Sequence, residues 1–162
     1  RANRFLIGGE PANTLLWIKG VDIGESIVEK DNRQAFLPLL KFRKLLLPID
    51  FHIQSKKILD IGSKTEKIFV SEIMKAGTVI WNGPLGLFEK KGFEKGSMTI
   101  ARAIVSNRKC FSLAGGGETV LFLRKYEFFD KFSFVSTGGG AMLEFLAGEK
   151  LPGIIALERN HK

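Results

Sequence analysis

Two runs of three glycines, at residues 115–117 and 138–140, each follow a short apolar segment and precede a helix-like segment. Glycine has no Cβ, so an anion can approach its backbone N–H groups closely. N–H groups at the start of a helix, together with the helix dipole, attract negatively charged oxygens. The pattern therefore predicts a site for a phosphorylated ligand. For each run taken singly, the alternative that glycine only closes a tight turn stays open.

Side chains near these glycines could complete such a site. Glu118 could hold a Mg²⁺ ion that bridges phosphates, or it could simply complement the helix dipole. Thr119 could donate to a phosphate or cap the helix. Glu89, after the segment "NGPLGLF", could bind a ribose or face solvent. The sequence contains neither a G-x-x-x-x-G-K-[ST] loop nor a G-x-G-x-x-G fingerprint.

Short apolar runs alternate with amphipathic segments of helix length along the chain. We predict strands at residues 4–9, 44–53, 57–62, 78–83, 110–116 and 132–139, with a bend at Pro48. We predict helices at residues 10–20, 31–44, 63–77, 92–107, 118–126 and 140–148. In the helix at 31–44, Asp31 would be the N-cap and Pro38 would disturb the helical hydrogen bonds. Repeated strand–glycine–helix units predict an α/β fold: an open parallel sheet with helices on both faces, in one domain over residues 1–162.

The composition narrows the class of protein. The chain is 44% hydrophobic and 26% charged, as in ordinary globular proteins. Its net charge is +8, but its basic residues form no run longer than a pair, so we predict no nucleic-acid partner. Cys110 is the single cysteine, which excludes an internal disulfide and favours a reducing, cytoplasmic setting. No apolar run reaches the roughly 18 residues that span a membrane. We expect Trp17, Trp81 and the Phe-rich segment 128–134 in the core.

Seven segments together resemble the C-terminal, nucleotide-binding half of phosphoglycerate kinase. They are "FLIGGEPANTLL", "GVDIGESIVEKD", "LLLPIDFHI", "ILDIGSKT", "TVIWNGPLGLFE", "AGGGETV" and "FVSTGGGAMLEFLAGEKLPGIIAL". The resemblance implies an α/β lobe that binds Mg²⁺ with ATP or ADP. It also implies direct phosphoryl transfer to or from 3-phosphoglycerate, which an N-terminal lobe holds, and a protein that is usually monomeric. Such transfer depends mainly on positioning and charge neutralisation.

The resemblance also assigns roles to individual residues. It places the backbone of Gly138 and Gly139 at the transferring phosphoryl group, and Glu118 at the phosphates with an indirect link to Mg²⁺. It implies that Glu89 binds the ribose. The full set of nucleotide-binding residues that it implies is Gly9, Gly62, Asn82, Gly83, Leu85, Phe88, Glu89, Gly116, Gly117, Glu118 and Thr119.

The sequence also departs from the family pattern. Glu10 and Pro11 replace a glycine and a methionine beside the adenine pocket, Ser63 replaces a proline, and Glu118 replaces an aspartate. The loop between Ile53 and Lys57 is much shortened. The sequence starts at Arg1 without the N-terminal lobe or the first strand of the C-terminal lobe and its lysines, so we read it as a truncated lobe.

Two expectations follow from the truncation. The sheet must close differently, pair with another chain or fray, because unpaired backbone groups are costly. The chain alone is not expected to turn over. A non-catalytic nucleotide-binding relic and an unrelated interaction role remain the alternatives.

Overall fold

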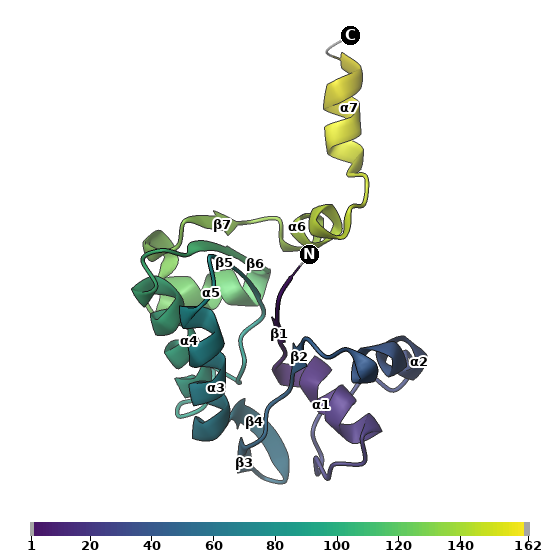
Figure 1. The fold of residues 1–162 in the computed structure, drawn as a ribbon, viewed down its shortest axis with the longest axis vertical. Helices are drawn as coiled ribbons and strands as arrows, with labels where there is room; N and C mark the ends of the chain where they lie inside the picture. The colour runs from purple at the N-terminus through teal and green to yellow at the C-terminus, as the bar shows by residue number, and fades with distance from the viewer. Residues whose placement is uncertain (1, 161–162) are drawn as a thin grey trace. The chain divides into compact units, whose positions relative to one another are not determined.

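This computed structural model describes residues 2–160, and the chain divides into two compact units. Unit 1 comprises Arg1–Gly77 and Pro84–Cys110, and unit 2 comprises Thr78–Gly83 and Phe111–Lys162. Their elements are labelled in Figure 1. Within residues 2–160, no helix is both long enough and apolar enough to span a membrane.

Unit 1 contains two strand pairs and a set of helices. β1 (Phe5–Leu6) and β2 (Leu45–Leu46) pair in parallel, whereas β3 (Phe51–Gln54) and β4 (Lys57–Ile61) form an antiparallel hairpin. The helices are α1 (Gly9–Ile18), α2 (Arg33–Phe36), the 3₁₀-helix η1 (Leu37–Lys41), α3 (Ser63–Met74) and α4 (Lys95–Ser106). The periodic segments predicted as helices at 10–20, 63–77 and 92–107 are therefore confirmed.

Two predicted elements of unit 1 differ from the structure. The strand predicted at 44–53 divides at Pro48 into β2 and β3, which belong to different sheets. The helix predicted at 31–44 is a single α-helical turn that tightens into η1 where Pro38 interrupts it. Its N-cap is Asn32 rather than Asp31.

The core of unit 1 lies largely where α3 packs against α4. Phe69 and Ile73 of α3 and Ile100 and Ile104 of α4 are all at most 4% exposed. Asn107, at the C-terminal end of α4, donates from Nδ2 to the carbonyl oxygens of Ile73 and Ala76, at 2.9 Å each. These bonds join the C-terminal end of α4 to the last turn of α3 and to the residues just after it.

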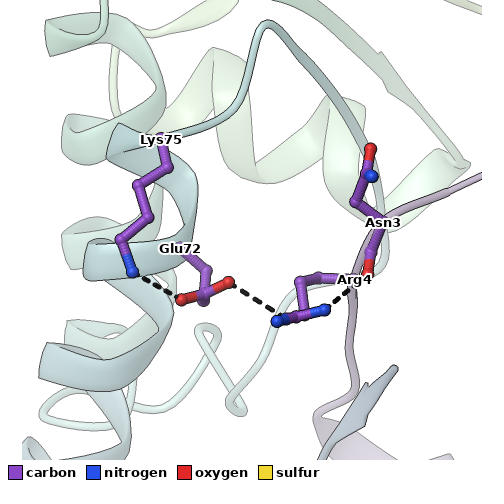
Figure 2. Close-up of polar contacts among 4 residues, drawn as sticks. All are labelled: Asn3, Arg4, Glu72 and Lys75. Carbon is purple, nitrogen blue, oxygen red and sulfur yellow. Dashed lines mark hydrogen bonds and ion pairs between the residues drawn. The ribbon is translucent and has the colours of Figure 1, made fainter. Parts of the chain in front are cut away.

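An ion-pair cluster joins the N-terminal segment to α3 within unit 1 (Figure 2). Arg4 Nε lies 3.2 Å from Glu72 Oε2, and Lys75 Nζ lies 2.8 Å from Glu72 Oε1. The hydrogen bond from Lys75 is the main reason that the pKa of Glu72 is lowered, and Arg4 adds to the effect. Because the cations are well exposed, solvent and salt screen these pairs.

Unit 2 is a three-stranded parallel sheet with its connecting helices. The strands are β5 (Thr78–Asn82), β6 (Phe111–Gly115) and β7 (Phe134–Ser136), in the order β5-β6-β7. The helices are α5 (Gly117–Lys125), the 3₁₀-helix η2 (Phe129–Lys131), α6 (Gly139–Ala147) and α7 (Pro152–Asn160). All three strands and both helices predicted in this unit from glycine spacing are confirmed.

The core of unit 2 is aromatic. Trp81 packs edge-on against Phe122 and stacks on Phe132, with ring centroids 5.6 and 6.0 Å apart. Trp81 is 6% exposed and Phe132 is 8% exposed, as predicted. The core prediction is wrong for Trp17 of unit 1, which is 36% exposed, and for Phe134, which is 58% exposed because it points outward from β7.

The fold class is α/β, with parallel strands joined through helices, as predicted. Within residues 2–160 the parallel pairs fall into two sheets, β1–β2 and β5–β6–β7. The sequence prediction of one domain stays a prediction.

Candidate functional site

The carboxyl ends of the three strands of unit 2 lie in line. Asn82 of β5 pairs in register with Gly115 of β6, and Gly115 pairs with Ser136 of β7. Helices α5 and α6 begin within a few residues of these ends. The first N–H groups of α5 and α6 are therefore presented at the same edge of the sheet, where parallel α/β sheets bind ligands.

Some of the glycines at this edge are required by the fold itself. Gly116 is the N-cap of α5 and has a φ of +95°, a conformation that other residues rarely adopt. A Cβ on Gly139 would lie 2.5 Å from the Cα and N of Gly116, so these two turns pack backbone against backbone. A Cβ on Gly115 would meet the side chain of Met142 at 2.5 Å. Backbone conformation therefore explains Gly116 and backbone packing explains Gly139, whereas the contact at Gly115 is with the end of a flexible side chain that could move.

Packing does not explain Gly117 and Gly140. A Cβ on either residue would meet nothing within 4 Å, and neither residue has a positive φ. Both lie in the first turn of a helix, where neither the backbone conformation nor the neighbouring atoms require glycine. Gly117 was among the predicted residues, whereas Gly140 was missed, although it belongs to the second glycine run. Two exposed glycines without a structural reason are consistent with a ligand that must approach this backbone.

Thr119 is fully buried, at 0% exposed, so its position differs from that of a surface phosphate ligand. Its Oγ1 accepts the N–H of Gly83 at 2.7 Å. Trp81 Nε1 donates to the carbonyl oxygen of Gly83 at 2.8 Å, so both backbone groups of Gly83 are held by side chains of unit 2. Thr119 therefore joins the start of α5 to the end of β5.

Glu118 lies in the first turn of α5 and is exposed. In residues 2–160 no group of three or more His, Cys, Asp or Glu side chains is placed to hold a metal ion by itself. A Mg²⁺ ion needs only one or two carboxylates when phosphate oxygens and water complete its shell. One exposed carboxylate beside open helix N–H groups fits a metal ion that binds together with a phosphorylated ligand.

Asn82, another of the predicted residues, is exposed at the end of β5.

Five of the predicted residues belong to unit 1. Gly9 opens α1 with a φ of +59°, and Gly62 is the buried N-cap of α3. Leu85 and Phe88 are buried, and Glu89 is exposed, in the loop of residues 84–93 before α4. Gly9 approaches this loop, because its Cβ would lie 3.8 Å from the carbonyl oxygen of Pro84.

Asp50 organises the turn at Gly62, although nothing in the sequence pattern singled it out. Its carboxylate oxygens accept the N–H groups of Lys64 and Thr65 at 2.9 and 2.7 Å and also the Thr65 hydroxyl, so it caps α3 from outside the helix. Burial alone would raise the pKa of Asp50, but these hydrogen bonds outweigh it and hold the pKa below the ordinary value. A Cβ on Gly62 would lie 2.4 Å from the Asp50 carboxylate, so the cap also explains this glycine.

Within unit 2 the structure therefore brings together Asn82, Gly83, Gly116, Gly117, Glu118, Thr119, Gly138 and Gly139. Within unit 1 it places Gly9 beside the loop that carries Leu85, Phe88 and Glu89. An apolar groove of unit 1 between α1 and β2, lined by residues such as Leu16, Phe42 and Leu46, contains none of the predicted residues.

Unit 2 has the architecture of α/β proteins whose parallel strands lead through glycine-rich turns into helices. A family model described as phosphoglycerate kinase matches residues 1–149. The chain belongs to the phosphoglycerate kinase family.

Individual relatives agree with this assignment. The phosphoglycerate kinases of Dictyoglomus turgidum and Gloeobacter violaceus are 39% and 40% identical to the chain, over 98% of its length and 46% and 47% of their own. The solved structure of phosphoglycerate kinase from Coxiella burnetii matches with a TM-score of 0.87 at 33% identity, over 100% of this chain and 48% of that one. The structure from Pyrococcus horikoshii matches with a TM-score of 0.81 at 31% identity, over 97% of this chain and 45% of that one. The chain thus spans about half the length of the relatives that it matches.

Proposed function

We propose that this chain is the nucleotide-binding half of a phosphoglycerate kinase and that it binds ADP or ATP together with Mg²⁺. The observation that carries the proposal is the pair of open glycines, Gly117 and Gly140, at neighbouring helix starts on one sheet edge. Helix N-termini with free N–H groups favour phosphate oxygens. Gly153 is equally open, so openness alone does not indicate a ligand; what distinguishes Gly117 and Gly140 is that both stand at helix starts beside the carboxyl ends of paired parallel strands.

In unit 2, the N–H groups at the starts of α5 and α6 would bind the phosphates. The backbone of Gly138 and Gly139 would lie nearest the transferring phosphoryl group, and Gly116 and Gly117 would bind the phosphates further from it. Glu118 would hold the Mg²⁺ ion indirectly, and the ion supplies charge neutralisation on the phosphate oxygens when it is bound. Thr119 would act by holding Gly83, and with it the end of β5 at Asn82.

In unit 1, the proposed contacts are to the nucleoside. Leu85 and Phe88, which are buried, would support the base from the protein interior, and the exposed Glu89 would accept hydrogen bonds from the ribose hydroxyls. Gly9 and Gly62 would let the starts of α1 and α3 approach the nucleoside closely. The exposed carboxylate of Glu10 in the first turn of α1 is expected to weaken affinity for the polyanionic ligand.

For the whole enzyme we propose phosphoryl transfer between 1,3-bisphosphoglycerate and ADP, without a covalent enzyme intermediate. Binding of 3-phosphoglycerate would come from an N-terminal lobe, so this chain of 162 residues is not expected to turn over alone. We further propose a monomeric, cytoplasmic protein with neither a nucleic-acid nor a membrane partner.

Calorimetric titration with magnesium ADP tests the proposal through Gly117→Ala. The methyl group has open space in the fold and raises helix propensity, so the variant should be at least as stable as the wild type. Nucleotide affinity should nevertheless fall, because the methyl group occupies the space of a phosphate. Gly153→Ala is the matched control: it also has open space, in α7, and should leave affinity unchanged. Undiminished affinity in Gly117→Ala would count against the proposed site.

A further inference from the structure

Asp60 is a buried carboxyl group of unit 1 for which the proposed function has no use. It lies on β4 and is 1% exposed. Its Oδ1 accepts the N–H of Ile61 at 2.9 Å, and its Oδ2 accepts the N–H of Gly96 at 2.8 Å. Gly96 is the second residue of α4, so Asp60 satisfies one of the N–H groups that every helix start leaves unpaired.

Two glycines close around this carboxyl group. A Cβ on Gly86 or on Gly96 would lie 2.3 Å from Asp60 Oδ1. Gly86 belongs to the loop of residues 84–93, and Gly96 follows it at the start of α4. The two ends of the loop therefore pack against one side chain.

Further bonds fix the same loop to β4 and α4. The N–H of Leu87 donates to the carbonyl oxygen of Leu59 at 2.8 Å, beside Asp60 on β4. The N–H of Leu85 donates to the hydroxyl of Ser97 at 2.8 Å, and Ser97 is 0% exposed. Asp60 and Ser97 therefore both contact the loop that carries Leu85, Phe88 and Glu89: Asp60 packs against Gly86, and Ser97 accepts the N–H of Leu85.

We propose that Asp60, with Ser97, is a positioning residue that holds loop 84–93 in the conformation that the nucleoside requires. The inference rests on the proposed function, because that function assigns Leu85, Phe88 and Glu89 to the nucleoside. Asp60 itself touches no ligand. It acts by fixing the backbone from which those three side chains project.

The pKa of Asp60 reflects its burial and its hydrogen bonds to the backbone. Burial raises the pKa of Asp60 to about 6, against the opposing effect of the N–H groups of Gly96 and Ile61. Glu66 raises this pKa further, and His52, its register partner on β3, lowers it.

The test compares Asp60→Asn and Ser97→Ala with a control that destabilises unit 1 elsewhere. Asp60→Asn is isosteric but cannot accept both N–H bonds, and Ser97→Ala removes the acceptor of Leu85. Asn107→Leu loses two hydrogen bonds at the other end of α4, far along the helix from the loop. Each variant is first shown to be folded at the assay temperature, and its free energy of unfolding is measured.

Calorimetry is then done with two probes, magnesium ADP and magnesium tripolyphosphate. Asp60→Asn and Ser97→Ala should weaken ADP binding by about tenfold, the equivalent of one lost hydrogen bond, and should change tripolyphosphate binding little. Asn107→Leu should change neither affinity. Equal loss for both probes, or an equal loss in the control, would overturn the inference.

Hydrogen exchange on the ligand-free chain separates this inference from the proposed function. In Asp60→Asn the amides of Leu85 and Leu87 should exchange faster, while those of α3 keep their protection. Unchanged protection in the loop overturns the inference alone. A wild-type chain that binds neither probe overturns the proposed function, and the nucleotide part of this inference with it.

Discussion

Replacement of Thr119 by valine tests how unit 2 holds the end of β5. Valine has nearly the same shape as threonine, so the buried space stays filled, but the acceptor for the Gly83 N–H is lost. A buried donor left without a partner costs about 1–3 kcal/mol. Thr119→Ser is the control: it keeps the hydroxyl and loses one buried methyl group, which is worth about 1 kcal/mol.

The assay uses the two tryptophans of the chain. Trp17 lies in unit 1 and Trp81 is buried in unit 2, so a Trp17→Phe background leaves emission that reports on unit 2 alone. Urea unfolding of Thr119→Val in this background should show the loss of about 1–3 kcal/mol. Hydrogen exchange should show fast exchange at Gly83 in Thr119→Val and slow exchange in Thr119→Ser. A Gly83 amide that stays protected in Thr119→Val would refute the reasoning.

Three further predictions concern the carboxyl groups and the activity. The pKa of Asp60 is about 6 in the folded chain, and the ordinary value is 3.8. The folded chain therefore holds this proton more tightly than the unfolded chain. The free energy of unfolding should fall as pH rises between these two values, by up to about 3 kcal/mol. Urea titrations across this range should show that Asp60→Asn removes this part of the slope. Asp50→Ala should lower the free energy of unfolding by about 1–2 kcal/mol, because it removes the cap of α3. Since the folded chain lowers the pKa of Asp50, the stabilisation by this cap should weaken as pH falls through the acid range. Urea unfolding in neutral and acidic buffers measures both effects. In a coupled assay with 1,3-bisphosphoglycerate and ADP, the chain alone should form no ATP. ATP formation only after a separately expressed N-terminal lobe is added would support a truncated or split enzyme, and no formation with the lobe would favour a non-catalytic relic.

Local patterns predicted most helices and the strands of unit 2. Helix period located α1, α3 and α4, and glycine after each apolar run located the ends of β5, β6 and β7. Their common register follows from parallel pairing, which is why the cluster of turns in unit 2 could be anticipated. Periodicity failed at residues 31–44, where Pro38 breaks the helical pattern into two short pieces.

Interactions between residues far apart in sequence could not be predicted. Asp50 caps a helix that begins 13 residues later, and Asp60 binds Gly96 across 36 residues. Neither has the local spacing of a capping motif. The direction of the Thr119 hydroxyl is likewise set by Gly83, 36 residues earlier. The two-residue turn at Ser55 and Lys56, both with positive φ, carries no glycine or asparagine that would mark it.

The most direct test of the account is an amide NMR titration of the wild-type chain with magnesium ADP. Binding of phosphates at the starts of α5 and α6 predicts the largest shifts at the amides of residues 116–118 and 138–140. Saturable shifts elsewhere, with these six amides unmoved, would contradict the proposed phosphate site.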